Sequence, residues 1–501
     1  MVAADKPKPK ASKNAALGDL REFLRQAEET GELARIAGAD PDRELGALYE
    51  LAHEHAYPPV LLFEAIKGCD PAFRIATCLR NSKLMVGELS LAAVQEFRKR
   101  PKEKVEPIPP REVNYGPLLE TMVEGDAVDV TRFPAPLWHA QDGGRYIGTE
   151  CMIVVRDPDS DWVNLGTYRV MVHDAKTLGV FIESGKDADI IRKKYWARGE
   201  ACPMAISVGQ APILGMVAGN NHGHGVSEYA VAGARIGTPI DIVRGAVTGL
   251  PLPAEGELAF EGFMPPPEIE SRKEGPFGEW PGYYASDHRP EPVLRVKAVY
   301  HRKDAIVTGA PPLKPTYPGR QVIVSRLAGL WDAIEAAGVP EVRGVWTMPG
   351  GGGRFIQVVA IKQLHAGHAK MAGLVAAGCG AGAYMTRLVI VVDEDVDITN
   401  AAEVMWAVAT RWDPKTQTDI IDGCWTGHID PLLPPDKREA HDTTTARMII
   451  YAVRPFAWKD QFPKVNMVDR DYAEQIRAKW QDKLAYLRKG RSPALSVPSA
   501  Y

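Results

Sequence analysis

Cysteine is scarce in this chain and is not arranged for a structural task. The 501 residues include six cysteines and no Cys-x-x-Cys pair. They stand at Cys69, Cys78, Cys151, Cys202, Cys379 and Cys424. This spacing argues against a disulfide framework and against a zinc site, and it favours a reducing cytoplasm as the location.

The chain also lacks an excess of positive charge. Its 60 Lys and Arg residues stand against 64 Asp and Glu residues, which gives a net charge of -4. The isoelectric point is near 6.3. We find no zinc-finger, recognition-helix or RNA-binding signature, so nucleic acid is not expected as a partner.

Long apolar runs are missing as well. The longest weakly polar stretch, Met371 to Met385, is rich in glycine and shorter than a membrane span, so no membrane partner is expected. Met1 to Asn14 carries four lysines with no apolar core behind them. We interpret residues 1–14 as a disordered tail rather than a secretory signal.

Familiar catalytic motifs are absent or incomplete. The run Gly350 to Gly353 lacks the Lys-Ser/Thr of a phosphate loop, and Gly378 to Gly382 follows a predicted helix instead of a strand, so both are interpreted as turns. No Gly-x-Ser-x-Gly elbow is present for serine hydrolase chemistry. His222-Gly-His224 leaves two interpretations open, a metal or substrate pair and two solvated loop histidines.

What the chain does have is enough length and apolar content for two or three domains, and its patterns predict an α+β protein. Residues 15–110 are interpreted as an N-terminal α/β domain. Apolar residues recur at helical spacing from Leu17 to Ala27, Pro59 to Ile66 predicts a strand, and a second helix follows Ser90. A Pro- and Lys-rich stretch, 101–110, predicts a linker.

Residues 111–318 change to a pattern of short strands. One helix, Ala188 to Arg198, interrupts them, and the series fits a β-barrel or sandwich. The predicted strands are Cys151 to Val155, Asn164 to Val172, Val180 to Glu183, Pro203 to Val208, Ile240 to Val247, Glu257 to Phe263, Val293 to Tyr300 and Ala305 to Thr308.

The rest of the chain returns to alternating strands and helices. Residues 319–338 are interpreted as a linker helix and residues 339–465 as a second α/β domain. Its predicted elements are Phe355 to Ile361, His368 to Ala377, Leu388 to Val392, Ala401 to Arg411 and Met448 to Val453. Residues 466–501 hold a last amphipathic helix, Tyr472 to Leu487, which we expect to contact a neighbouring subunit, followed by a tail.

Two motifs carry the chemistry, Asn164-Leu-Gly-Thr-Tyr-Arg169 and Glu274-Gly-Pro-Phe-Gly-Glu279. Arg169 lies in a run, 161–172, that predicts a mostly buried strand, while glycine and proline place Glu274 and Glu279 on a loop. The alternative interpretation is that Arg169, Glu274 and Glu279 form solvated ion pairs on the surface. Charges among apolar neighbours must be paired or functional, and a guanidinium between two carboxylates suits acid-base chemistry on an anionic substrate.

With three further motifs, this pattern resembles the UbiD family of reversible decarboxylases that use prenylated FMN. The further motifs are Gly225-Val-Ser-Glu-Tyr229, Gly282-Tyr-Tyr284 and Val391-Val-Asp-Glu-Asp395. The resemblance covers about residues 17–490. It implies an N-terminal α/β domain, a split β-barrel flavin-binding domain and a C-terminal α/β oligomerisation domain. It also implies a homodimer or homohexamer, with a flavin prenyltransferase of the UbiX type as the supplier of the cofactor.

The resemblance assigns roles to individual residues. Arg169, Glu274 and Glu279 match a catalytic triad. Asn164 and Glu228 match the ligands of a Mn2+ or Mg2+ ion, and the main chain near Trp162, Val217 and Ala218 matches a K+ site. Flavin-contacting positions are Thr167, Tyr168, Arg169, Phe181, Ile182, Glu183, Lys186 and Glu228. The third metal ligand, a His in much of the family, falls here on Gly185 or Lys186, and Lys186 could instead face the flavin phosphate.

When CO2 leaves an aryl or vinyl carbon, a negative charge remains on that carbon. The implied mechanism uses a cofactor to take up this charge. Arg169 would orient the substrate carboxylate, Glu279 would protonate the carbon, and Glu274 would tune both. Burial against Phe277 and Trp280 should raise the pKa of Glu279, whereas Arg169 should lower it. The sequence leaves that balance open.

Substrate choice is predicted to depend on His428 and Asp430. They match the part of the C-terminal domain that approaches the flavin, and they favour a small aromatic acid with a polar ring, such as a hydroxybenzoate or a nitrogen heteroaromatic acid. Both could instead cap a loop. Two other functions stay open, an inactive flavin-binding relative and a plain flavin reductase.

Overall fold

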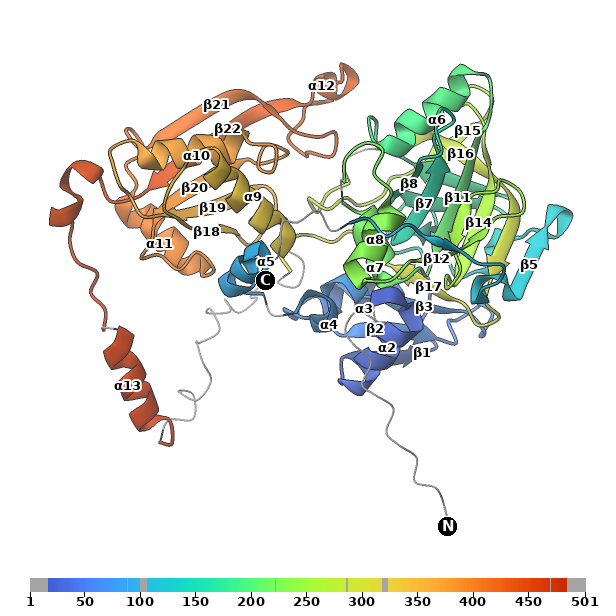
Figure 1. Ribbon diagram of the computed structural model, residues 1–501, viewed down its shortest axis with the longest axis horizontal. Coiled ribbons are helices and arrows are strands. Elements are labelled where there is room, and N and C mark those ends of the chain that lie inside the picture. Colours follow the sequence, from blue (N-terminus) through green and yellow to red (C-terminus); the bar gives the residue numbers. More distant parts are fainter. Residues whose placement is uncertain are drawn as a thin grey trace, which may run out of the picture. The chain divides into compact units, whose positions relative to one another are not determined.

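The computed structural model describes residues 17–87, 89–99, 106–220, 222–284, 287–317, 323–468 and 470–483. The predicted tail, 1–14, and the end of the predicted last helix, 484–487, lie outside these residues. The chain divides into two compact units, the first with residues 1–89, 100–320 and 429–432 and the second with the rest (Figure 1). Within the described part, no helix combines the length and apolar character that crossing a membrane requires.

The first unit begins with a four-stranded sheet in the order β1-β2-β3-β17. Its strands are Leu33–Ala37, Val60–Glu64, Arg74–Thr77 and Ile306–Gly309, and its helices are α2 (Leu20–Glu29), α3 (Glu44–Ala52) and α4 (Lys83–Val86). Asp19 caps α2 by accepting a hydrogen bond from the Glu22 N–H at 2.8 Å. The strand predicted at 305–308 was expected in the barrel, but β17 pairs in parallel with β3. The apolar run 305–308 predicts a strand but does not indicate whether that strand belongs to the barrel or to the N-terminal sheet.

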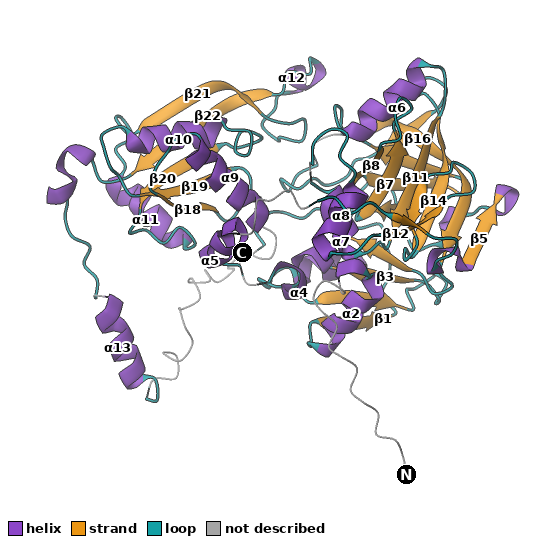
Figure 2. Ribbon diagram, in the orientation of Figure 1, coloured by secondary structure: helices purple, strands orange, loops and turns teal. Residues whose placement is uncertain are grey.

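A ten-stranded, largely antiparallel sheet forms the centre of this unit, with the main order β6-β9-β10-β16-β14-β11-β7-β8, and Figure 2 shows part of it in orange. The strands are β5 (Thr121–Glu124), β6 (Tyr146–Gly148), β7 (Cys151–Arg156), β8 (Val163–Gly166), β9 (Arg169–Asp174), β10 (Thr177–Phe181), β11 (Cys202–Val208), β14 (Leu258–Met264), β15 (Ser271–Glu274) and β16 (Arg289–His301). A small sheet joins β4 (Arg111–Glu112), β12 (Asp241–Arg244) and β13 (Pro251–Pro253).

Both faces of the central sheet are covered, which explains why its strands are apolar throughout. Ile153 and Val155 of β7 belong to one buried cluster, and Met152 and Val154 belong to another. Side chains alternate between the faces of a strand, so a strand with two buried faces shows no polar alternation.

The connection between β8 and β9 requires this sheet to curl. β8 lies at one edge of the strand order, and β9 lies next to the opposite edge. Two residues, Thr167 and Tyr168, separate the end of β8 from the start of β9. Consecutive Cα atoms are about 3.8 Å apart, so the two strand ends lie within about 11 Å of each other. The sheet edges therefore approach each other, as in a split barrel.

Three helices cover the barrel where the sequence predicted one. The predicted helix is α6 (Asp187–Ala197), and the others are α7 (Pro212–Ala218) and α8 (Glu228–Ile236). The helices α7 and α8 are short and consist largely of small and apolar residues, so helical periodicity did not reveal them.

The second unit is a five-stranded sheet in the order β18-β19-β20-β22-β21 with helices packed on it. The strands are Val342–Thr347, Ile356–Ile361, Leu388–Asp393, Thr444–Ala452 and Thr418–Trp425 in that order. The helices in contact with the sheet are α5 (Leu91–Lys99), α9 (Val324–Ala336), α10 (His368–Gly378) and α11 (Ala401–Arg411). The unit also includes α12 (Pro435–Glu439) and α13 (Arg470–Trp480). The sequence did not predict the edge strands β18 and β21.

Helix α5 is a correction to the predicted order. It was expected to pack within the N-terminal segment, but it belongs to the second unit. Its Arg98 forms an ion pair with Asp332 at 2.7 Å and stacks over the ring of Trp331 at 4.2 Å. The partner of an amphipathic helix is chosen by long-range packing, which neighbouring residues in the sequence do not reveal.

Candidate active site

Arg169 is the first residue of β9, where the chain crosses the split of the barrel. The sequence predicted one continuous strand from 164 to 172, and this was wrong. β8 pairs with β7, whereas β9 pairs with β6 and β10, so the chain must break at Thr167 and Tyr168 to change partners. The break leaves Arg169 at a strand end.

The structure brings the three predicted catalytic residues together. The Arg169 guanidinium donates from Nε and Nη2 to the two oxygens of Glu274, each at 2.9 Å. Its Nη1 donates to Oε1 of Glu279 at 2.5 Å. The exposed fractions of the side chains are 8% for Arg169, 1% for Glu274 and 18% for Glu279. Glu279 is therefore the member of the group with the most access to solvent.

Aromatic rings surround this ion cluster. The guanidinium of Arg169 lies over the ring of Phe181 at 4.3 Å and 5.7 Å from the ring of Phe277. Tyr146 donates from its hydroxyl to Oε1 of Glu274 at 2.7 Å, and its ring contacts that of Phe277 at 4.1 Å. The sequence analysis missed Tyr146, although a buried tyrosine needs a polar partner for its hydroxyl.

Close backbone contacts position the loop that carries Glu279. Glu274 ends β15, and Gly275 then turns the chain with a φ of 80°. The N–H of Gly143 donates to the carbonyl of Pro276 at 2.7 Å. A Cβ on Gly143 would lie 1.7 Å from the carbonyl oxygen of Gly275. The two segments can approach this closely because position 143 has no side chain.

Burial decides the protonation of Glu279. It raises the pKa of this carboxyl to about 7, against the opposing pull of Arg169 and with support from Glu183 and Glu274. The sequence left this balance open. For Arg169, burial favours the neutral form, but the two carboxylates raise the pKa of the guanidinium above its usual value. A permanent cation thus lies beside an acid whose pKa suits proton transfer near neutral pH.

Arg289 is a second guanidinium at the site that the sequence analysis missed. It lies directly across from Glu274 in the pairing of β15 with β16. Its guanidinium is over the ring of Phe181 at 4.2 Å and forms an ion pair with Glu291 at 2.6 Å. Its charge lowers the pKa of Glu279, so it acts against the effect of burial.

Asn164 and Glu228, the predicted metal ligands, are buried side by side. The Asn164 amide donates to Oε1 of Glu228 at 3.2 Å, and the Leu165 N–H donates to Oε2 at 2.9 Å. Within the described residues, Oδ1 of Asn164 is buried without a hydrogen-bond partner. Burial raises the pKa of Glu228 to about 7. An amide oxygen with no donor next to a buried carboxyl fits a hard divalent cation.

These two ligands do not complete a metal site by themselves. No group of three His, Cys, Asp or Glu side chains in the described ranges is placed to hold a metal. Gly185, where a third ligand was expected, has a φ of 80° and donates its N–H to Asp189. Lys186 is exposed and stands just before α6.

The predicted flavin contacts lie at the barrel split and on the β9–β10 side of it, where Phe181 pairs with Arg169. Thr167 and Tyr168 form the link between β8 and β9, while Phe181 ends β10 and is followed by Ile182 and Glu183. The hydroxyl of Thr167 is buried without a partner among the described residues. A buried donor of this kind fits a polar ligand.

The predicted potassium positions are joined by the loop that contains the two histidines. The ring of His222 bonds the Val217 carbonyl at 3.0 Å, next to the buried Ala218. His224 contacts the ring of Trp162 at 4.6 Å and pairs with Asp187 at 3.2 Å. The histidines thus have different partners.

The predicted substrate residues have local contacts. Asp430 is buried, and its Oδ1 accepts a hydrogen bond from the Leu432 N–H at 3.0 Å. The ring of His428 lies edge-on to that of His441 at 5.4 Å. The contact of Asp430 fits the loop-capping alternative, and it leaves the substrate role a prediction.

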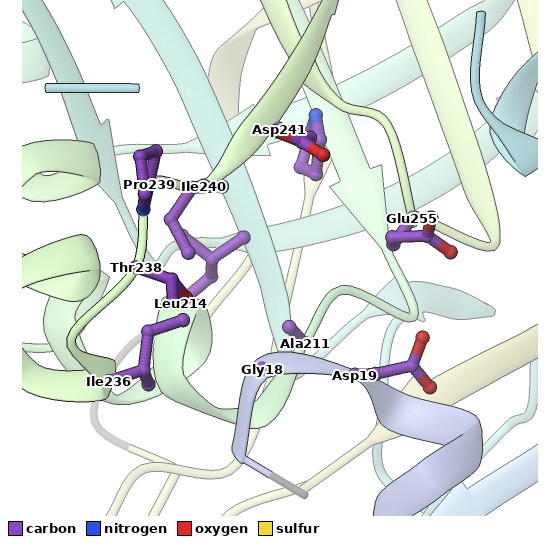
Figure 3. A pocket seen from close by; sticks show the side chains of 11 residues that line it. Gly18, Asp19, Ala211, Leu214, Ile236, Thr238, Pro239, Ile240, Asp241 and Glu255 are labelled. Atoms are coloured by element: carbon purple, nitrogen blue, oxygen red, sulfur yellow. The ribbon is translucent and has the colours of Figure 1, made fainter. Parts of the chain in front are cut away.

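A separate cavity of about 360 Å³ lies elsewhere in the first unit (Figure 3). Leu214, Ile236 and Ile240 contribute its apolar wall, and Asp19 and Glu255 are among its polar lining. None of the predicted site residues lines this cavity, so it is distinct from the triad.

Two family models match the chain. The UbiD model, described as the 3-octaprenyl-4-hydroxybenzoate carboxy-lyase Rift-related domain, matches residues 111–315. The UbiD_C model, described as the 3-octaprenyl-4-hydroxybenzoate carboxy-lyase C-terminal domain, matches residues 323–452.

Similar proteins cover most of the chain. A pyrrole-2-carboxylic acid decarboxylase from Pseudomonas aeruginosa is 32% identical over 80% of this chain and 84% of its own. A phenolic acid decarboxylase from Bacillus subtilis is 31% identical over 88% and 93%.

Solved structures of the UbiD-class enzyme HmfF from Pelotomaculum thermopropionicum share the fold. The complex with FMN has a TM-score of 0.76, with 28% identity over 91% of this chain and 98% of that chain. An evolved dimeric form in complex with prFMN has a TM-score of 0.73 over the same shares at 28% identity. The predicted mixed fold, with a split barrel and a separate C-terminal α/β part, is confirmed.

Proposed function

The chain belongs to the UbiD family of prenylated-FMN-dependent carboxy-lyases, and from this membership we propose that it is a reversible, non-oxidative decarboxylase of an aromatic or heteroaromatic carboxylic acid. The observation that carries the proposal is the buried cluster in which Arg169 contacts both Glu274 and Glu279. A flavin reductase would have no need for two carboxylates on one guanidinium.

The residues of this chain have distinct tasks in the proposed reaction. Arg169 binds and orients the substrate carboxylate through paired hydrogen bonds. The bond from the ring carbon to the carboxylate breaks, CO2 leaves, and Glu279 delivers its proton to that carbon. Glu274 holds Arg169 in place. Prenylated FMN, when bound, supplies the electron sink that loss of CO2 from an sp² carbon requires.

The chain offers a fitting set of groups for this cofactor. Thr167, Tyr168, Arg169, Phe181, Ile182, Glu183, Lys186 and Glu228 would hold it, and Asn164 with Glu228 would hold Mn2+ or Mg2+ beside its phosphate. The oxygens of Thr167 and Asn164 that are buried and have no hydrogen-bond partner among the described residues support this assignment. The K+ site near Trp162, Val217 and Ala218 belongs to the same proposal.

The proposed substrate has a polar ring. Relatives act on pyrrole-2-carboxylic acid and phenolic acids according to their names. His428 and Asp430 are proposed to favour such rings, because buried polar groups reject a ligand that leaves them without partners. A flavin prenyltransferase of the UbiX type as the cofactor supplier, a cytoplasmic location and a homodimer or homohexamer complete the proposal, as do the domain boundaries near residues 110, 318, 338 and 465.

Production of the full chain together with a flavin prenyltransferase tests the proposal. The spectrum and mass of the bound cofactor are recorded, and CO2 release is measured from pyrrole-2-carboxylate and a set of hydroxybenzoates. Prenylated FMN with release from one acid supports a decarboxylase and identifies its substrate class. Prenylated FMN with no release from any acid supports the inactive relative, and oxidation of a nicotinamide without CO2 release supports the reductase.

A further inference from the structure

The second unit contains a half-buried arginine whose two terminal nitrogens are fully buried and have no partner among the described residues. Arg326 lies in the first turn of α9. Its Nη1 and Nη2 atoms are buried, and within the described residues they have no hydrogen-bond partner. Burial of a charge without a partner is unfavourable. A group of this kind calls for an anion.

The surroundings of Arg326 are positive. Burial and the positive charge of Arg354 both lower the pKa of Arg326, to about 9. The first turn of α9 has no acidic residue, and Ile323 before it provides no side-chain cap. The positive end of the helix dipole therefore adds to the two guanidiniums.

Other buried arginines in the same unit show what a satisfied guanidinium looks like. Arg411 forms ion pairs with Asp393 at 3.0 Å and with Asp395 at 2.7 Å. Arg447 donates to main-chain carbonyl oxygens, among them that of Thr386 at 2.6 Å. The terminal nitrogens of Arg326 have neither kind of partner in the part of the chain that the structure describes.

We propose that Arg326 is a binding site for an oxyanion, either a carboxylate or a phosphate group. The planar fork of a guanidinium fits both through two parallel hydrogen bonds.

The neighbourhood of the site connects it to the predicted substrate segment. Arg354 lies over the ring of Tyr384 at 5.6 Å. A Cβ on Gly427 would lie 2.4 Å from the hydroxyl of Tyr384. Tyr384 thus lies between Arg354 and the residue that precedes His428. The anion site itself does not depend on the proposed decarboxylation.

Thermal unfolding of the full chain without cofactor provides the test. Sodium phosphate and sodium benzoate are titrated separately in a low-salt buffer, with sodium chloride at matched ionic strength as the reference. A saturable rise in Tm beyond that in chloride is expected, and the anion with the larger rise at equal concentration identifies the ligand as phosphate or carboxylate.

Four variants locate the effect. Arg326→Met should abolish the rise, and Arg326→Lys, which keeps the charge but not the fork, should weaken the apparent affinity by about tenfold. Arg343→Gln removes an exposed arginine that pairs with Glu341 in the same unit and should keep the full rise. The titrations are repeated in the Arg169→Met background, where benzoate cannot bind through the proposed substrate anchor, and Arg326→Met should still remove the rise there.

The stability of Arg326→Met without added anion distinguishes an anion-binding role of Arg326 from a purely structural one. Arg326→Met should then be at least as stable as the parent protein, because an unpaired buried charge has been removed. A rise in Tm that survives in both Arg326 variants would overturn the proposal. So would a parent protein that phosphate and benzoate stabilise no more than chloride does. Because no turnover is measured, failure of the decarboxylase proposal leaves this result intact.

Discussion

Arg169 meets Glu274 fork to fork, with one hydrogen bond of 2.9 Å to each carboxylate oxygen. Glu274 is also bonded by Tyr146, whereas the contact from Arg169 to Glu279 is a single hydrogen bond. We infer a division of work in which Glu274 holds the guanidinium and the more exposed Glu279 exchanges the proton.

Glu279→Gln should lower kcat by about 10²- to 10⁴-fold, because the amide retains the size of the side chain but cannot donate a proton in the same way. Binding of the flavin should persist, as measured by the cofactor spectrum of the purified variant. Glu268→Gln, at an exposed position of the same unit, is the matched control. Full activity of Glu279→Gln would remove the proton-donor role.

The pH dependence of kcat should have a descending limb near pH 7, because Glu279 with a pKa of about 7 loses its proton there. Arg289 lowers this pKa, so Arg289→Gln should shift the limb to higher pH. A pH profile of both proteins is the measurement, and a limb that stays in place in Arg289→Gln would contradict the electrostatic link.

The Glu279 carboxyl also makes the stability of the folded protein depend on pH. The pKa of Glu279 in the folded state is about 7 and its ordinary value is 4.5, so protonation favours the folded state. This contribution is fully present below about pH 4.5 and is lost as the pH rises through 7. Comparison of Tm between the parent protein and Glu279→Gln across this range isolates it, since the variant lacks the titration.

Tyr146→Phe should destabilise the protein by about 1.5–3 kcal/mol, because a buried charged carboxylate loses a hydrogen bond. Activity should fall as well, since Glu274 loses one of the groups that hold it. Denaturant unfolding and turnover are the measurements. Tyr283→Phe, whose side chain is 60% exposed, is the control and should be close to neutral. Equal stability of the two variants would mean that the Tyr146 hydroxyl does not support the site.

Gly143→Ala should impair catalysis because it displaces the backbone of the loop that carries Glu279. The new Cβ would meet the carbonyl oxygen of Gly275 at 1.7 Å and force apart the segments that position Glu279. Gly278→Ala, in the same loop as Glu279, meets nothing within 4 Å and should leave kcat and Tm nearly unchanged. Turnover and Tm of both variants are compared, and equal behaviour would show that the close approach does not position the loop.

Glu228→Gln should weaken Mn2+ binding by roughly tenfold or more, because an anionic oxygen ligand is lost. Mn2+ bound to the protein is measured by electron paramagnetic resonance without any assay of activity. In the parent protein, binding should weaken as the pH falls below about 7, where protons compete for Glu228. Binding that does not change in Glu228→Gln would place the cation elsewhere.

Much of this molecule could be predicted from local sequence patterns. Strand β11 and helix α11 appeared close to where the apolar runs placed them, because strand and helix periodicity are properties of neighbouring residues. The grouping of Arg169 with Glu274 and Glu279 followed from apolar neighbours and from resemblance to a family. The break at Thr167 and Tyr168 did not, because it depends on which strands β8 and β9 pair with.

The sequence by itself determined the composition class, most elements of the two units, the family and the three charged residues of the triad. Tertiary structure decided the rest. It assigned β17 and α5 to sheets and helices far away in the chain, and it curled the central sheet so that Arg169 lies at the split. It also raised the pKa of Glu279, because folding buries this carboxyl in a cluster with Arg169, a residue more than a hundred positions away in the chain. Local patterns carry propensities, but the choice of a packing partner and the loss of solvent are properties of the folded whole.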